Sequence, residues 1–482
     1  MRHALLWVTA GLALVLFAVG CGSTSSNFGD GGADGGDLDS TFAPDNPFGQ
    51  TDGGPGEGGC VNLQCQQTCS TTSISGYVYD PKGTVPLYNV YVYVPNAPLD
   101  PIPTGVTCTQ CQAPASGSPV VSATTDETGH FSIPNAPDGD NIPLVMQLGK
   151  WRREITLPHV SKCQDNRYNT KTNPKDTTVE SLMRMPKKQK EGSPNDNIPQ
   201  IAVTTGSCDY TECFLLNTVG IDTSEFAKGG RVNIYDGSGG ETSYPYSYGS
   251  AVTNLYDKLS TLMTYDIVLN SCECGTEDRG TGYGNVESYL NSGGRFFGTH
   301  YMYNFFASAS ECALGFYPDP TCKGPSDFNG VAQWVGDSGG KYTSAPFLID
   351  QSFPKGASLA KWVNNIEGGT LGQLNLYETR YDVNLVTTGK ATRWIYTDTP
   401  GGNASSAYST LYLSFNTPTT QPVQNQCGRA VFSDVHVAGT SSGFCQNPSP
   451  SYQPNLDALE FLFFDLSSCV QNDSQPPVPP PH

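Results

Sequence analysis

Two histidines follow apolar stretches that are typical of buried β-strands. His300 comes directly after the stretch RFFGT, and His436 stands near the end of RAVFSDVHV. The chain has six histidines in all, so two of them at strand ends of one predicted sheet are informative. An imidazole exchanges protons near neutral pH and is also a common metal ligand. The pattern predicts acid–base chemistry or metal binding at this edge; the alternative is that both histidines are structural.

Other polar side chains follow predicted strands in the same way. Thr205 and Gly206 end one strand, and Ser271, Cys272 and Glu273 end another. Ligands of doubly wound sheets bind at the carboxyl ends of the strands. We therefore expect a pocket with a rim formed by Glu273, His300, Tyr301, Asp434 and His436.

A metal site at this rim would combine His300 and His436 with Glu273 or Asp434, and would leave one position open for water. Nothing in the spacing demands a metal, and we expect no cofactor. Cys272 is a minor alternative as a nucleophile, because reactive thiols need an electropositive setting and acidic residues surround this one. A disulfide is the expectation for Cys272.

The elements that must position these residues alternate between strand and helix over residues 199–470. Apolar strands are predicted at PQIAVTTG, RVNIYDG, YDIVLNS, RFFGT, RWIYTD, TLYLSFN and RAVFSDVHV. Helices are predicted at CDYTECFLLNTVGI, GNVESYLNSGG and ASLAKWVNNI, and around Leu456–Leu466. This alternation predicts a flavodoxin-like α/β domain with a mostly parallel sheet and helices on both faces.

At YDIVLNSCE, RFFGTHY and GRAVFSDVH this domain resembles the class I glutamine amidotransferase-like superfamily, in particular its trehalose-utilisation-like branch. The superfamily's active members place a cysteine on a tight strand-to-helix turn. His300 stands at that position here, and Met302 replaces a glycine two residues later. The resemblance therefore implies the turn without the thiol mechanism, which weighs against an enzyme. Residues 306–355 and 370–425 have no clear counterpart in the superfamily.

Residues 71–160 show period-2 alternation, which predicts a small antiparallel β-sandwich with domain bounds of 59–163. Turns are predicted at Asp80–Gly83 and Asp126–Gly129. The motifs GYVYD, NVYVYV and TDETGHF resemble the carboxypeptidase regulatory-like, or transthyretin-like, domain, which implies a non-catalytic module. A proline-rich insertion covers 95–118. Residues 164–198 are polar and locally basic, and are expected to form a solvated linker.

The N-terminus has the pattern of an export signal. Residues 1–20 contain a short polar start and an apolar run, and Ala18–Cys21 resembles the bacterial lipobox, in which Cys21 is lipidated. Gly22 is not the aspartate associated with inner-membrane retention, which favours the outer membrane. Residues 21–58 are expected to be an unfolded tether, and 471–482 a proline-rich tail.

The chain contains sixteen cysteines, and fifteen remain once Cys21 is set aside. An exported protein with this many is expected to form disulfides, and the odd count leaves at least one cysteine over. Connectivity stays open. A zinc site at Cys65, Cys69, Cys108 and Cys111 is the minor alternative. Disulfides are expected at Cys60, Cys65, Cys69, Cys108, Cys111, Cys163, Cys208, Cys213, Cys312, Cys322, Cys427, Cys445 and Cys469.

The composition of the chain argues against one class of function. The formal net charge of −19 argues against binding nucleic acid. The leading hypothesis is an outer-membrane lipoprotein, facing the periplasm or the cell surface, that binds an envelope carbohydrate or protein without catalysis. The alternative is an extracellular hydrolase of glycans or peptides that uses a histidine and a carboxylate. The tyrosine-rich stretch 235–249 is either a sugar-binding surface or an ordinary loop.

Overall fold

The structure is a computed structural model that describes residues 60–111, 113–168, 183–240, 250–312, 322–336, 346–398, 409–436, 445 and 449–481. All of the described residues belong to one compact unit. The predicted signal peptide, Cys21 and the tether lie outside the described residues, as does most of the tyrosine-rich stretch. No described helix has the length and apolar composition needed to cross a bilayer.

The N-terminal region consists of two small sheets, and this confirms the predicted sandwich. A short 3₁₀ helix, η1 (Asn62–Gln66), precedes them. One sheet has the order β4-β1-β7 and the other β3-β2-β5-β6. All their strand pairs are antiparallel except β1 with β7. The strands are β1 (Ser73–Tyr77), β2 (Tyr91–Pro95), β3 (Pro119–Thr124), β4 (His130–Pro134), β5 (Gly139–Leu148), β6 (Trp151–Val160) and β7 (Asp165–Tyr168).

Both predicted turns of the sandwich are present. Gly83 and Gly129 have φ values of 83° and 76°, in the left-handed region that glycine adopts without strain. In the first turn, the Asp80 carboxylate accepts hydrogen bonds from the amides of Thr84 and Val85 at 2.7 and 2.8 Å. Aspartate is favoured at the first position of this turn because its side chain accepts hydrogen bonds from backbone amides of the turn.

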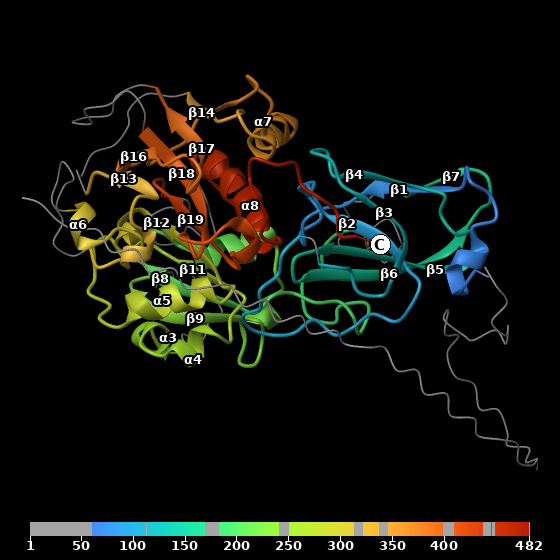
Figure 1. The fold of residues 1–482 in the computed structure, drawn as a ribbon, viewed down its shortest axis with the longest axis horizontal. Coiled ribbons are helices and arrows are strands. Elements are labelled where there is room, and N and C mark those ends of the chain that lie inside the picture. The colour runs from blue at the N-terminus through green and yellow to red at the C-terminus, as the bar shows by residue number, and fades with distance from the viewer. Residues whose placement is uncertain are drawn as a thin grey trace, which may run out of the picture. The chain divides into compact units, whose positions relative to one another are not determined.

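The C-terminal region is built on one ten-stranded sheet of order β10-β9-β8-β11-β12-β19-β18-β17-β14-β15 (Figure 1). The pairs from β10 to β19 are parallel and those from β19 to β15 antiparallel. Its strands are β8 (Ile201–Gly206), β9 (Val232–Ser238), β10 (Ser250–Ala251), β11 (Ile267–Asn270), β12 (Arg295–Thr299), β14 (Phe347–Ile349), β15 (Gln373–Leu374), β17 (Ala391–Thr397), β18 (Ser409–Thr417) and β19 (Gly428–Ser433). A separate pair joins β13 (Ala332–Trp334) and β16 (Val383–Val386).

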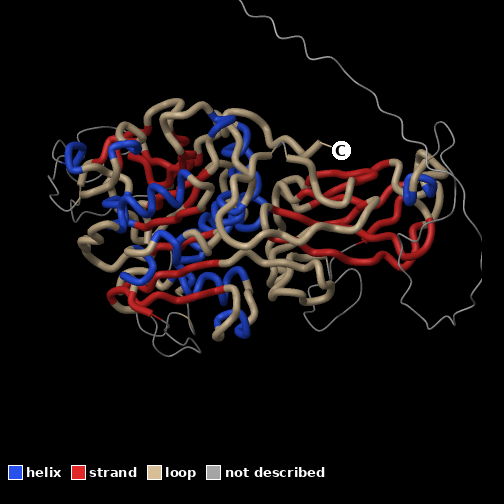
Figure 2. The backbone as a smooth tube through the Cα atoms, turned by 60° about the horizontal axis from the view of Figure 1, so that its bottom comes forward, coloured by secondary structure: helices blue, strands red, loops and turns tan. Residues whose placement is uncertain are grey.

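Helices cover both faces of the large sheet, as predicted (Figures 1 and 2). The α-helices are α2 (Thr211–Cys213), α3 (Thr253–Tyr256), α4 (Leu259–Leu262), α5 (Gly282–Asn291), α6 (Ala309–Cys312), α7 (Pro354–Glu367) and α8 (Gln453–Ser467). A π-helix, η2 (Phe214–Val219), follows α2, and 3₁₀ helices are η3 (Thr223–Phe226), η4 (His300–Phe305), η5 (Ser326–Phe328), η6 (Val423–Asn425) and η7 (Pro450–Tyr452).

Alternation along the strands divides the core in two. Val268 and Phe296 pack with Leu290 of α5 in one core, whereas Leu269 and Phe297 belong to the core that contains α8. Successive side chains of a strand point to opposite faces, so each parallel strand contributes to both cores. The fold class is therefore the predicted one, a β-sandwich followed by an α/β region with a mixed, mostly parallel sheet.

The sandwich shares the α8 core with the α/β region. Tyr88 stacks on Phe461 of α8 with ring centroids 5.8 Å apart, and Trp362 Nε1 of α7 donates to the Pro86 carbonyl at 2.7 Å. Met183, in the segment predicted as a linker, is fully buried in the same core. Asp473, in the predicted tail, is 7% exposed. These contacts make both segments part of the packed structure.

Seven disulfides among the described residues confirm the expected disulfide chemistry. Every cysteine predicted to form one does so, including the four considered for zinc, and Cys274 joins them. Two bridges, Cys108–Cys427 and Cys111–Cys469, connect the sandwich insertion to the α/β region. The others are Cys60–Cys65, Cys69–Cys163, Cys208–Cys274, Cys213–Cys445 and Cys312–Cys322.

Candidate functional site

The candidate site lies where four parallel strands end. In the register of the sheet, Asn270 of β11 pairs with Gly298 of β12, and Thr299 pairs with Ser433 of β19. Cys272, His300 and His436 therefore leave the sheet at one edge, and Asp209 follows β8 at the same edge. This is the carboxyl edge, where ligands of such sheets bind.

His300 begins η4 with a φ of 44°, which is unusual for a residue with a side chain. The strained turn expected from the amidotransferase resemblance is therefore present, with histidine on it. A left-handed conformation of this kind costs roughly 1–3 kcal/mol and is concentrated at functional sites. The His300 side chain is 4% exposed and its ring lies 4.9 Å, centroid to centroid, from that of His436. The two histidines are neighbours, as predicted.

His436 is held by a carboxylate that the sequence reasoning did not select. Its Nδ1 lies 3.2 Å from Asp209 Oδ2, and Thr299 Oγ1 donates to the same oxygen at 2.6 Å. A carboxylate beside Nδ1 favours the tautomer that carries its proton there, which leaves the Nε2 lone pair free to accept. His436 is 1% exposed, and its Nε2 has no hydrogen-bond partner among the described residues.

His300 lies between a thiol and a second carboxylate. Its Nδ1 is 3.5 Å from Cys272 Sγ, and its Nε2 is 3.5 Å from Asp382 Oδ2. Burial, followed by the charges of His436 and Arg380, holds the pKa of His300 well below its ordinary value. His300 is therefore neutral at pH 7.

Asp434 fixes the neighbouring chain segment rather than contacting a histidine directly. Its Oδ2 accepts hydrogen bonds from the amides of Asp382 at 2.6 Å and Val383 at 3.2 Å. Burial raises the pKa of Asp434 to about 6, although these amides partly offset the effect. Asp434 thereby positions Asp382, and Asp382 in turn lies beside His300.

The structure does not bring Glu273 to the histidines. Its carboxylate forms an ion pair with Arg279 and accepts a hydrogen bond from the Ser238 amide at 3.1 Å. Tyr301 is half-buried and places its ring 4.0 Å from that of His300. Of the five predicted rim residues, His300, His436 and Tyr301 therefore lie together, and Asp434 supports them.

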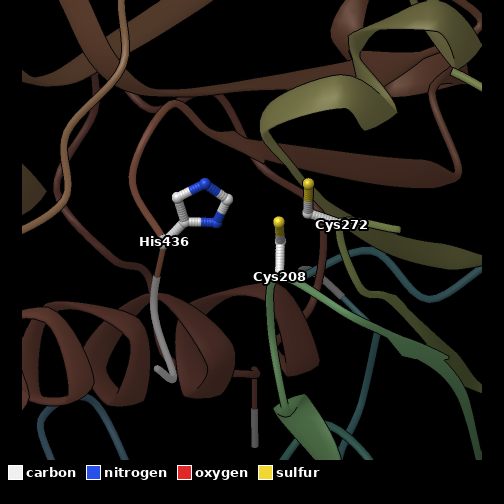
Figure 3. Close-up of side chains that lie close together, drawn as sticks. All are labelled: Cys208, Cys272 and His436. Atoms are coloured by element: carbon white, nitrogen blue, oxygen red, sulfur yellow. The ribbon is translucent and has the colours of Figure 1, made fainter. Parts of the chain in front are cut away.

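The expectation that Cys272 forms a disulfide is wrong. It is the one free cysteine among the described residues, and it is fully buried. The disulfide Cys208–Cys274 lies beside it instead, and Figure 3 shows Cys208 and Cys272 next to the His436 ring. Burial, followed by the charge of Asp209, raises the pKa of the Cys272 thiol. The physical reason for the miss is that spacing alone does not fix which cysteines pair.

Within the described part of the chain, one group of three potential metal ligands comes together. The ligand atoms of Cys208, Cys272 and His436 lie within 4.8 Å of one another. This is not the set predicted from the sequence, and the sulfur of Cys208 is bonded to Cys274 rather than available as a thiolate.

Sequence reasoning missed Asp209 and Asp382. Asp209 could have been found, because it follows the strand at 201–206 and the same strand-end argument that selected the histidines applies to it. Asp382 carried no signal, since it lies in the segment 370–425 that matched no part of the resemblance.

No protein family and no curated protein matches this sequence. Among solved structures, a ThuA-like protein from Bacteroides uniformis is 12% identical, with 57% of this chain and 95% of that one covered and a TM-score of 0.31. A cytoplasmic protein from Salmonella typhimurium is 11% identical, with coverages of 57% and 100% and a TM-score of 0.29. An exo-β-1,4-mannosidase from an Opitutaceae bacterium is 11% identical, with coverages of 65% and 47% and a TM-score of 0.25.

Proposed function

We propose that this chain is an envelope hydrolase in which His436, oriented by Asp209, is the general base. The observation that carries the proposal is the buried His436–Asp209 pair, with an acceptor nitrogen that no described residue occupies. It lies at the carboxyl edge of a parallel sheet, beside a second imidazole and a strained turn. Buried, unsatisfied and strained groups lower stability, so their concentration in one place favours a functional role.

In the proposed reaction, His436 Nε2 accepts a proton from a water molecule that attacks the substrate. Asp209 stabilises the imidazolium that forms, because its Oδ2 lies against Nδ1. The protonated His436 then gives this proton to the leaving group as it departs, and the neutral His300, with Asp382 near its Nε2, lies beside the His436 ring. Both steps use groups within a few ångströms of one another, which is the geometry that general acid–base catalysis requires.

The substrate is proposed to be a glycan or a peptide of the cell envelope. The cluster adjoins half-buried residues at Tyr301 and Cys208, so these mark the side from which a substrate approaches. The aromatic face of Tyr301 suits a sugar ring, which stacks on such faces through its apolar C–H groups. The acidic chain is unsuited to nucleic acid.

We further propose that the protein is attached to the outer membrane through a lipidated Cys21. Support comes from the export signal and the lipobox-like Ala18–Cys21. Metabolic labelling with a palmitate analogue in a bacterial host should mark the wild-type chain and not Cys21→Ala. Equal labelling of both would contradict the anchor.

The test of the hydrolase compares two histidine–aspartate pairs in one protein. Full-length protein in mild detergent is incubated with isolated peptidoglycan and with a panel of soluble polysaccharides, and released reducing ends and amino groups are measured. His436→Ala and Asp209→Asn should each lower the rate about 10²–10⁴-fold, as loss of a general base does. The matched control is His159→Ala, since His159 pairs with Asp140 on the surface at 2.5 Å and should not affect the rate.

The second candidate is a binding protein without catalysis, and a cavity in the sandwich favours it. This cavity has a volume of about 310 Å³ and is lined by Tyr91, Asp100, Lys150, Arg152 and Val478 among others. It combines apolar walls with charged groups, as ligand sites do. Retention of a polysaccharide without released product, lost in Arg152→Ala and kept in His436→Ala, would favour binding over hydrolysis.

A further inference from the structure

Three cysteines meet at the carboxyl edge of the sheet, and only two of them are bonded to each other. Cys272 is a thiol beside the Cys208–Cys274 disulfide, and its sulfur lies within 4.8 Å of Cys208 Sγ. Figure 3 shows both side chains extending from neighbouring segments into the same space. A thiol this near to a disulfide is positioned for exchange with it.

The backbone holds the two sulfurs together. The Cys208 amide donates to the Cys272 carbonyl at 3.1 Å, and the Cys272 amide donates to Thr299 Oγ1 at 2.9 Å. Gly206 permits this approach, because a Cβ at that position would lie 2.1 Å from the Cys272 carbonyl oxygen. The juxtaposition is thus built by the ends of β8, β11 and β12.

We propose that Cys272, Cys208 and Cys274 form a thiol–disulfide exchange site that captures disulfide substrates at the protein surface. The substrate class is an accessible disulfide, either of a small molecule or of another exported protein. The proposal does not rest on the hydrolase activity proposed above.

The first step is internal. The Cys272 thiol, whose sulfur lies 3.5 Å from His300 Nδ1, loses its proton to solvent, and the thiolate attacks Cys208 Sγ. A Cys272–Cys208 bond forms, the Cys208–Cys274 bond breaks, and Cys274 leaves with the electron pair. No external oxidant or reductant is consumed, because one disulfide replaces another.

The second step takes place at the surface. Cys274 is exposed, whereas Cys272 is fully buried. Exchange therefore moves the free thiol from the interior to solvent. The Cys274 thiolate then attacks one sulfur of an external disulfide, which forms a mixed disulfide and releases the other sulfur as a thiol.

The groups that face the Cys272 thiol set how the exchange rate depends on pH. His300 and His436 lie beside it together with the carboxyl groups of Asp209 and Asp382. Because burial and the two carboxylates raise its pKa, the thiolate is scarce near neutral pH. The rate should rise about tenfold for each pH unit between 7 and 9, since the attacking species is the thiolate.

The test uses full-length protein with oxidised glutathione as the probe. After acid quenching, digestion without reduction and mass spectrometry should find glutathione on Cys274 together with a Cys208–Cys272 bridge. The Cys60–Cys65 disulfide is an internal control and should remain intact. Absence of an adduct, or glutathione on Cys272 with Cys208–Cys274 unchanged, would overturn the proposal.

Two variants separate exchange from direct attack on the exposed disulfide. Cys272→Ser is nearly isosteric and should abolish the Cys274 adduct, and an adduct that persists would overturn the proposal. Thermal melting of the variant establishes that it is folded. Hydrolysis should persist in Cys272→Ser, which loses the adduct, so the two proposals fail independently.

Discussion

Strand β19 has buried ionisable groups at both of its ends, and the two sets of groups have different partners. At its start, Arg429 is 1% exposed and forms ion pairs with Asp465 at 2.8 Å and Asp473 at 3.0 Å. Lys355 contacts the same two aspartates, so two cations face two carboxylates. At the other end, Asp434 and His436 lie among further acidic groups and a neutral imidazole.

This difference in partners distinguishes the structural cluster around Arg429 from the candidate site around His436. Buried charges are tolerated when each has a partner of opposite sign, which is the arrangement around Arg429. Around His436, burial instead raises the pKa of Asp434 and lowers that of His300. Asp434, whose pKa is shifted toward neutrality, therefore exchanges protons more readily near physiological pH, whereas His300 stays neutral there.

The largest effect on the free energy of unfolding should come from removing a charge at the start of β19. Arg429→Gln removes one cation and leaves Asp465 and Asp473 with Lys355 alone. We expect the free energy of unfolding to fall by about 3–5 kcal/mol, as it does when a buried ion pair loses one partner. Urea denaturation followed by tryptophan fluorescence measures the change.

Lys361→Gln is the control for this variant, because Lys361 pairs with Glu127 at the surface and is 60% exposed. Its effect should stay below about 1 kcal/mol. If both variants lost a similar amount of unfolding free energy, the Arg429 cluster would contribute no more to stability than a surface ion pair.

Replacing one buried aspartate should have an intermediate effect on the free energy of unfolding. The change should have opposite signs at the two ends of β19. The pKa of Asp434, at about 6, lies above its ordinary value, so its stabilising contribution is complete at low pH and is lost as pH rises through 6. Asp434→Asn should therefore increase the free energy of unfolding at pH 8, by roughly 1–3 kcal/mol, and change it little at pH 4.

Asp473→Asn is the matched comparison. Burial alone would raise the pKa of Asp473, but Arg429 and Lys355 outweigh it and hold the value at about 2. Its contribution is present above its ordinary pKa and is lost as pH falls through 2. The variant should lose about 2 kcal/mol at pH 8. Stability changes of the same sign for both variants would contradict the contrast between the two ends.

The central parallel strands were predictable from the sequence because they are fully buried and appear as short apolar runs. YDIVLN and RFFGT are examples, and the helix α5, Gly282–Asn291, separates them. In the antiparallel half, β17 and β18 were predicted as strands, whereas β14 and β15 are short segments, such as Phe347–Ile349, that match no family pattern. Their pairing depends on contacts distant in sequence, which periodicity does not report.

The candidate site was predictable only in part for the same reason. His300 and His436 could be selected because strand ends of one sheet converge. Asp382 is held beside His300 because its amide and that of Val383 donate hydrogen bonds to Asp434. No local sequence pattern predicts these hydrogen bonds. The free state of Cys272 depended on where all the other cysteines were placed, which requires the fold itself.

The smallest effect should come from removing one hydroxyl at each end. Thr299 Oγ1 donates to Asp209 at 2.6 Å and accepts from the Cys272 amide at 2.9 Å, so Thr299→Val removes the acceptor of that buried amide and one donor to Asp209. We expect a loss of about 1–2 kcal/mol. Thr392 Oγ1 donates to Asp473 at 2.9 Å, but Arg429 still serves that carboxylate in Thr392→Val, so the loss there should be under about 1 kcal/mol. Paired urea titrations measure both. Equal losses would mean that the carboxyl end of β19 is as well satisfied as its start, and the case for a reactive His436–Asp209 pair would lose its physical basis.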